Sequence, residues 1–395
     1  MDISSSRYRW IILVVGCFFH FTFTAAWIFV PIIETEFAGE LVLDPFQVSL
    51  IYSAPLLAFV IFVFIGGIIT DKLGVRNATM LSGILITSFG MLRGLSGGFL
   101  FLLITSFIFG IGGGLLYPNL GKIVADWFED KKKGTATGIY LMAGGLGQVF
   151  SLSITAAILL PLFQNNWRLC FVFYGFFCLI ITILGIFTLK TKEATNNSQQ
   201  KSFSLGKMKQ ILGNKYIIGL CVIIFFGFSV FMGLTNYMGD LLADKGLGDP
   251  VYVYLASILS LGLTIGNVTL PLLSDIVKKR RIFLICCSSI AFCLLILIQL
   301  INIGEFLWVL IFFLGLMQGT LIPLCLTVSI EIKTLPEELA GSVSGLLLTF
   351  GFLGNLTVTL IFGVILSYST VFFFCLLYLI CLGIASFIVS LFQEK

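Results

Sequence analysis

Apolar segments of about twenty residues recur along the whole chain, separated by short polar stretches. A helix needs about 20 residues to cross a hydrocarbon core about 30 Å thick, and these segments do not alternate as the strands of a membrane barrel do. We therefore predict an all-α membrane protein with twelve transmembrane helices. The expected spans are 10–33, 46–70, 78–96, 99–121, 134–160, 168–189, 216–240, 251–274, 282–302, 306–330, 340–366 and 369–392.

A polar stretch separates the sixth span from the seventh and divides the chain into halves. We predict an N-terminal six-helix half over 1–190, a cytoplasmic linker over 191–213, and a C-terminal six-helix half over 214–395. Short motifs of the first half recur in the second at offsets of 204 to 207 residues, which indicates an internal duplication. Matching positions are Asp71 and Asp275, Pro118 and Pro323, Gly138 and Gly345, and Gln148 and Asn355.

Composition and charge agree with this topology. A chain with 58% hydrophobic and 11% charged residues does not form a soluble globule. If both termini are cytoplasmic, all but three of the 23 Lys and Arg lie on the cytoplasmic side, as short loops require. The exceptions are Arg93, Arg168 and Lys245. We expect a multi-pass protein of the plasma membrane with both termini in the cytoplasm.

The turn after the second span resembles the signature of the major facilitator superfamily. The signature positions are Gly67, Asp71, Lys72, Gly74 and Arg76, and the second half keeps Asp275, Lys278 and Arg280. The second copy has Pro271 in place of the first glycine. The resemblance implies the fold of that family, with inverted repeats within each half, and a role for these residues as a conformational latch; the alternative is a set of ordinary helix-end charges.

The family resemblance also implies which spans surround the substrate pathway. Polar and aromatic residues stand out there against an apolar background. The predicted substrate-binding residues are His20, Trp27, Tyr52, Tyr117, Asn119, Gln148, Asn236, Tyr237, Gln318 and Asn355. Gln148 and Asn355 occupy equivalent repeat positions, so they would present two amides to one substrate; the alternative is hydrogen bonding between helices.

Few ionisable residues fall inside the spans. Arg93, Lys122 and Arg168 fall at span ends and are interpreted as interfacial charges. His20 lies well inside a span and would carry a coupling proton or, alternatively, pack as a hydrogen-bonded core residue. With no cation placed in the bundle, the predicted substrate is a small neutral, zwitterionic or cationic organic solute. The alternatives are a porter for small anions such as nitrate or carboxylates, and a non-transporting receptor of the same fold.

Other classes of function find no support in the sequence. It holds no HExxH, GxSxG or Walker-type motif, so we predict no enzyme activity. The ten cysteines form no CxxC pair and have no His partners, so we predict no metal and no cofactor. The net charge of +4 reflects the loops and does not indicate nucleic-acid binding. The expected partners are the small-molecule substrate, membrane lipid and a coupling proton or ion, for a monomer that works by rocker-switch alternating access.

Overall fold

The computed structural model describes residues 8–128, 130–189, 213–242, 249–277, 280–300, 304–330 and 340–368. All regular secondary structure in these residues is helical. Nine helical segments among them are long and apolar enough to cross a membrane, and two shorter apolar helices cover 282–298 and 346–357. These segments match the first eleven predicted spans. The twelfth, 369–392, lies outside the described residues.

The chain forms two compact units. Unit 1 comprises Met1–Thr191 with Leu247–Ser257 and Leu360–Tyr368, and unit 2 comprises Lys192–Gly246, Ile258–Thr359 and Ser369–Lys395. Apart from its last residue, the predicted linker over 191–213 lies outside the described residues, and the predicted boundaries of the two halves stay a prediction.

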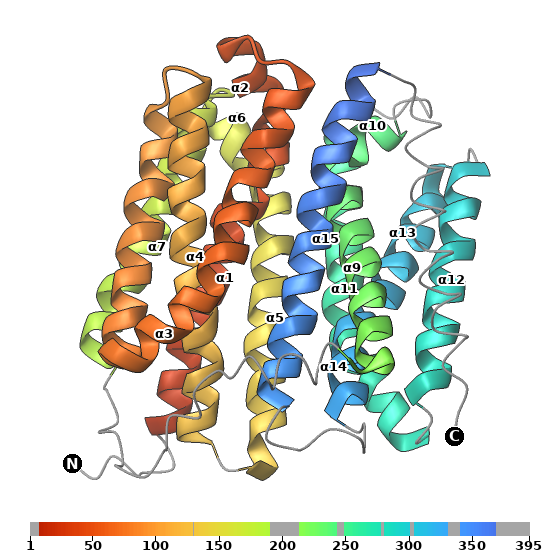
Figure 1. Ribbon diagram of the computed structural model, residues 1–395. Coiled ribbons are helices and arrows are strands. Elements are labelled where there is room, and N and C mark those ends of the chain that lie inside the picture. Colours follow the sequence, from red (N-terminus) through yellow and green to blue (C-terminus); the bar gives the residue numbers. More distant parts are fainter. Residues whose placement is uncertain are drawn as a thin grey trace. The chain divides into compact units, whose positions relative to one another are not determined.

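Unit 1 is a bundle of long helices that run up and down (Figure 1). Its helix α3 packs along α4 and α7, and α1 packs along α5 and α7. Short elements join them. The bounds are α1 Tyr8–Ile28, η1 Val30–Ile33, α2 Glu34–Leu41, α3 Pro45–Leu92, η2 Arg93–Leu95, α4 Phe99–Trp127, α5 Asp130–Ile154, the π-helix η3 Thr155–Leu159, α6 Leu160–Leu162 and α7 Trp167–Thr188.

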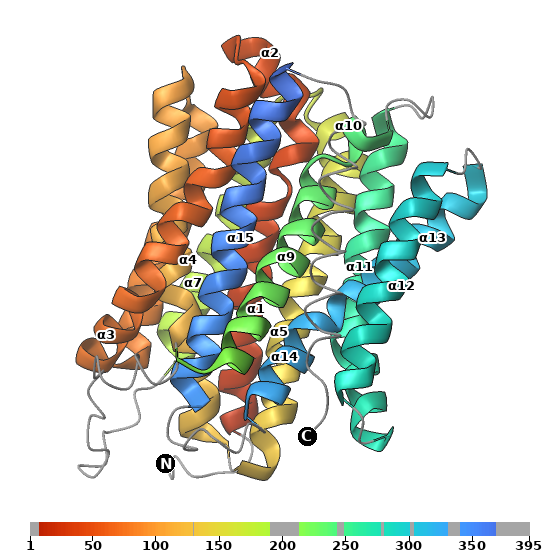
Figure 2. The same cartoon turned by 45° about the vertical axis from the view of Figure 1, so that its right-hand side comes forward.

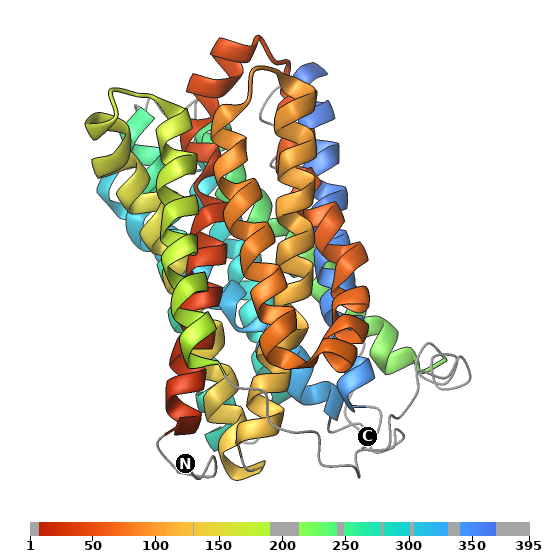
Figure 3. The ribbon, with the colours of Figure 1, turned by 90° about the vertical axis from the view of Figure 1, so that its left-hand side faces the viewer.

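Helix α3 contains two of the predicted spans. It begins with a capping box: the Asp44 carboxylate accepts from the Gln47 backbone N–H at 2.8 Å, and the Gln47 side chain accepts from the Asp44 N–H at 3.1 Å. Near its middle, Gly74 has a φ of 78°, which breaks the helix geometry. The chain folds back there, so the two arms of α3 run beside each other (Figure 3).

Unit 2 is built in a similar way from the later helices (Figure 2). Helices α13 and α14 pack against both α9 and α12. Its core includes Ile224, Leu321, Leu324 and Leu347, all almost fully buried. The bounds are α9 Lys215–Asn236, α10 Met238–Leu242, α11 Asp249–Val277, α12 Arg280–Leu300, α13 Gly304–Gly319, α14 Leu321–Ile330 and α15 Ala340–Tyr368.

The duplication is visible in the way helices touch inside each unit. In unit 1 a Cβ atom added to Gly110 of α4 would lie 2.1 Å from the carbonyl oxygen of Pro55 in α3. In unit 2 a Cβ atom added to Gly315 of α13 would lie 2.1 Å from the carbonyl oxygen of Leu259 in α11. Both glycines therefore allow backbone-to-backbone contact, at positions that match by the offset found in the sequence.

A second pair of contacts repeats in the same way. A Cβ atom on Gly147 of α5 would lie 2.4 Å from the carbonyl oxygen of Phe21 in α1. Its counterpart Gly354 of α15 stands in the same relation to Phe225 of α9, at 2.2 Å. The two units thus share a framework of close helix crossings, and equivalent positions on it can be compared directly.

Candidate functional site

The predicted substrate-binding residues are distributed over both units. In unit 1 they lie on α1 (His20 and Trp27), α3 (Tyr52), α4 (Tyr117 and Asn119) and α5 (Gln148). In unit 2 they lie on α9 (Asn236), directly after it (Tyr237), on α13 (Gln318) and on α15 (Asn355). That both sets bind one substrate stays a prediction.

His20 is the centre of a hydrogen-bonded group in unit 1. It is 2% exposed. Its Nδ1 lies 2.8 Å from the carbonyl oxygen of Tyr140 and its Nε2 lies 3.1 Å from the hydroxyl oxygen of Tyr117. A carbonyl oxygen only accepts hydrogen bonds, so in the neutral ring the proton is on Nδ1 and the Tyr117 hydroxyl donates to Nε2. This arrangement favours the packing alternative for His20.

A row of aromatic rings connects two further predicted residues. The Trp27 ring lies 6.1 Å from that of Phe59, and Phe59 lies 4.9 Å from Tyr117, edge to face. Phe59, absent from the prediction, is apolar and gave no signal in the sequence. The hydroxyl of Tyr52, another predicted residue of α3, donates to the carboxylate of Glu34 in α2.

Three predicted amides have buried polar atoms with no partner among the described residues, although Gln148 as a whole is half-buried. Asn119 is fully buried; its Oδ1 accepts from the Thr70 hydroxyl, while its Nδ2 has no partner. The Oε1 of Gln148 has none, and Gln318, 4% exposed, has none for either amide atom. Buried polar groups are nearly always paired in proteins, so these amides are the strongest candidates for contact with a bound molecule or water.

The remaining predicted residues of unit 2 lie in its interior. Tyr237 and Asn355 are each 3% exposed, and Asn236, the last residue of α9, is half-buried. Asn355 follows Gly354 as Gln148 follows Gly147, so the equivalence of the two amides extends to the helix contacts beside them.

Arg93 corrects the sequence analysis. It stands at a helix end, as expected, but it is 1% exposed, whereas the sequence analysis placed no cation inside the bundle. Its Nη2 donates to the carbonyl oxygen of Ala26 in the last turn of α1 at 2.8 Å, and its guanidinium carbon lies 3.9 and 4.6 Å from the ring centres of Phe109 and Phe171. Its Nε has no partner, and no carboxylate pairs with it among the described residues.

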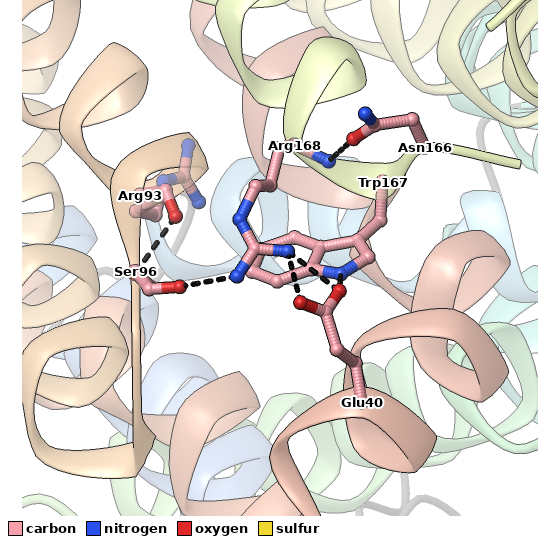
Figure 4. A network of polar contacts seen from close by, with 6 residues as sticks. All are labelled: Glu40, Arg93, Ser96, Asn166, Trp167 and Arg168. Atoms are coloured by element: carbon pink, nitrogen blue, oxygen red, sulfur yellow. Dashed lines mark hydrogen bonds and ion pairs between the residues drawn. The ribbon is translucent and has the colours of Figure 1, made fainter.

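Arg168 was also interpreted as an interfacial charge; its side chain is partly exposed, and its place relative to a membrane stays a prediction. It donates to both carboxylate oxygens of Glu40, at 2.7 and 2.5 Å, and to the carbonyl oxygen of Ser96 at 2.8 Å. The Trp167 indole donates to the same carboxylate at 2.7 Å. In Figure 4 the Arg93 guanidinium points away from this group; Glu40 pairs with Arg168, and no carboxylate in the described part of the chain pairs with Arg93.

The structure describes three residues of the predicted latch: two glycines and Arg76. A Cβ atom on Gly67 would meet no atom within 4 Å, and Gly74 makes the turn of α3. Arg76 donates from Nη2 to the carbonyl oxygen of Ile186 at 3.0 Å, in the last turn of α7, where a cation is favourable. The side chains of Asp71, Lys72, Asp275, Lys278 and Arg280 lie outside what the structure describes, so the latch stays a prediction.

Comparison with known proteins gives consistent results. The family model described as Major Facilitator Superfamily matches residues 12–359. A hexuronate transporter of Bacillus subtilis is 28% identical over 153 residues, 39% of this chain and 36% of that protein. A probable galactarate/D-glucarate transporter, GudP, of the same organism is 24% identical over 83% of this chain and 79% of its own. The solved D-xylose–proton symporter covers 98% of both chains with a TM-score of 0.77 at 16% identity.

Proposed function

The chain belongs to the major facilitator superfamily, and we propose that it is a secondary transporter of a small organic anion of the sugar-acid class. The observation that carries the proposal is its similarity to transporters named for hexuronate and for galactarate and D-glucarate. The sequence analysis favoured a neutral, zwitterionic or cationic solute because it placed no cation inside the bundle. The relatives favour its small-anion alternative instead.

The buried guanidinium of Arg93 supports an anionic substrate. A cation inside a membrane protein is costly unless something compensates its charge, and such residues commonly mark substrate pathways. Arg93 has one carbonyl oxygen and two aromatic faces, but no carboxylate among the described residues. At an effective dielectric constant of about 20, a unit charge about 10 Å away still gains roughly 1.7 kcal/mol from such a cation. A dicarboxylate gains about twice as much.

Transport of an anion into a cell works against the membrane potential, which is negative inside. The cost is about 2.3 kcal/mol per charge for each 100 mV, hence about 4.6 kcal/mol for a dianion. Co-transport of protons offsets this cost. We therefore propose uptake coupled to protons, by alternating access of the two predicted halves around the substrate.

The first experiment is thermal stabilisation of the purified protein in detergent by D-glucarate, galactarate and D-glucuronate, with glucose and choline for comparison. A ligand at about 100 times its dissociation constant adds about 2.7 kcal/mol. We expect the acids to stabilise the protein, and uptake of the same acids into vesicles to require an imposed inward proton gradient. Stabilisation by choline or glucose alone would overturn the proposal.

The contribution of Arg93 is tested by Arg93→Gln, with Arg168→Gln as the matched control in the same unit. We expect Arg93→Gln to weaken binding of the dianion galactarate more than that of the monoanion D-glucuronate, by roughly tenfold for about 1.4 kcal/mol. Arg168 and Glu40 are both partly exposed, so solvent screens the lost charge, and the variant should weaken the binding of both acids less than Arg93→Gln does. Equal losses for both acids in Arg93→Gln would assign Arg93 a structural role only.

A further inference from the structure

Gln318 of α13 is a buried amide. Its side chain is 4% exposed, and neither its Nε2 nor its Oε1 has a partner among the described residues. It lies on the same side of the helix as Leu314 and Ile311, both 1% exposed, so it faces the interior of unit 2. An amide that has lost its water without gaining a partner destabilises the protein, which raises the question of what it binds.

The equivalent place in unit 1 is filled differently. The offsets of the shared helix crossings match Gln318 with Gly113 and Gly227 of α9 with Phe23 of α1. In unit 1 the Phe23 ring lies against Gly113, where an added Cβ atom would be 2.2 Å from it. Unit 2 reverses the sizes, because the aromatic ring is replaced by Gly227 and the glycine by Gln318.

This exchange removes an aromatic ring from unit 2 and puts an amide in the same part of the framework. The Leu321 side chain, one turn from Gln318, covers Gly227 at 2.7 Å from an added Cβ atom. The leucine side chain supplies no hydrogen bond, so it leaves the polar atoms of Gln318 without a partner in the part of the chain that the structure describes. An apolar side chain of similar size would fill the same space in the core of unit 2. Packing alone therefore does not explain why the residue is Gln.

We propose that Gln318 binds a hydroxyl group of the substrate, which makes it a specificity-determining residue for hydroxylated acids. This inference rests on the proposed function. An amide offers both a donor and an acceptor, and a hydroxyl group also offers both, so one hydroxyl pairs with either end. A carboxylate only accepts and would leave the Oε1 of Gln318 unpaired. Gln318 therefore favours polyhydroxy acids over unsubstituted acids of the same length and charge.

The test compares D-glucarate with adipate, the six-carbon dicarboxylate that has no hydroxyl groups, in the full-length protein. We expect the wild type to bind D-glucarate at least tenfold more tightly than adipate. In Gln318→Met, which keeps the length of the side chain and removes both polar atoms, D-glucarate binding should fall roughly tenfold while adipate binding stays the same. A residue with only a structural role would change both affinities equally.

Ser288→Ala is the matched control, because Ser288 is buried in α12 and its hydroxyl also has no partner among the described residues. It should change neither affinity. D-glucarate binding that is unaltered in Gln318→Met would overturn the inference and assign the amide to a buried water. If the wild type binds neither acid, the proposed function is wrong. If the wild type binds both acids equally, the proposed function stands and the proposed role of Gln318 is wrong. These two outcomes are read from the wild type and do not depend on whether the variant folds.

Discussion

The close crossing of α11 and α13 predicts a large effect from a small substitution. In Gly315→Ala the new methyl group would lie 2.1 Å from the carbonyl oxygen of Leu259 and 2.9 Å from its carbonyl carbon. These are backbone atoms, so they cannot turn away as a side chain would, and the helices must separate. Overpacking of this kind costs about 1–3 kcal/mol, and we expect the upper end of that range.

For a unit of this size, 1 kcal/mol corresponds to about 2–4 °C, so the melting temperature of Gly315→Ala should fall by about 6–12 °C. The melting temperature of Gly110→Ala, the repeat counterpart, should fall by a similar amount. There the added methyl group would lie equally close to the carbonyl oxygen of Pro55. The assay is loss of the monodisperse peak on heating in detergent. Gly304→Ala, on the same helix with no atom within 4 Å of the added Cβ, is the control. If Gly315→Ala and Gly304→Ala had the same melting temperature, the close crossing of α11 and α13 would be refuted.

Three further predictions follow from polar groups of unit 1. His20→Gln should lower the melting temperature, because the ring bonds Tyr117 and a backbone carbonyl, yet leave the pH profile of vesicle uptake unchanged; a flattened profile would restore His20 as the proton carrier. Tyr174→Phe should cost about 1–2 kcal/mol in thermal unfolding, because the hydroxyl bonds α5 and the π-helix that follows it; an unchanged melting temperature would contradict this. Arg168→Lys should cost no more than about 1 kcal/mol, because its pair with Glu40 is partly exposed; a larger fall would show a stronger network.

The arrangement of spans was predictable because it depends on one quantity, the length of an apolar segment. Its interruptions were not. The π-helix η3 at Thr155–Leu159 lies inside a predicted uniform span, and the tenth span is divided at Thr320 into α13 and α14. Both depend on local hydrogen bonding. Tyr174, for example, donates to the Ser151 carbonyl at 3.2 Å beside η3, and no pattern in 134–160 reveals a partner on another helix.

The site shows the same limit at the level of single residues. Repeat offsets correctly paired the positions of Gln148 and Asn355 on the shared framework, because an offset needs only the sequence. The depth of Arg93 needed its neighbours Phe109 and Phe171, which come from other helices. One signal was available, since Arg93 falls inside the predicted span 78–96 rather than after it. A charge within a span is a functional candidate by default.

The two units use one framework for different purposes. Backbone contacts at Gly110 and Gly315 are the same, so the helix crossings do not distinguish the units. The side chains on them do. Where unit 1 has His20 beside Gly144, with both ring nitrogens paired, unit 2 has Ile224 beside Gly351 and no polar group at that position.

In unit 2 a buried polar side chain occurs at a different position of the shared framework. Gln318 stands where unit 1 has Gly113, and its amide has no partner among the residues described, whereas both ring nitrogens of His20 in unit 1 are hydrogen-bonded. Unit 1 has a buried cation, Arg93, and unit 2 has the buried amide of Gln318. A cation attracts any anion, whereas an amide forms hydrogen bonds with a hydroxyl group. Under the proposed function, selection for charge and recognition of hydroxyl groups are separate, so variants at Arg93 and Gln318 should act additively on the affinity for D-glucarate.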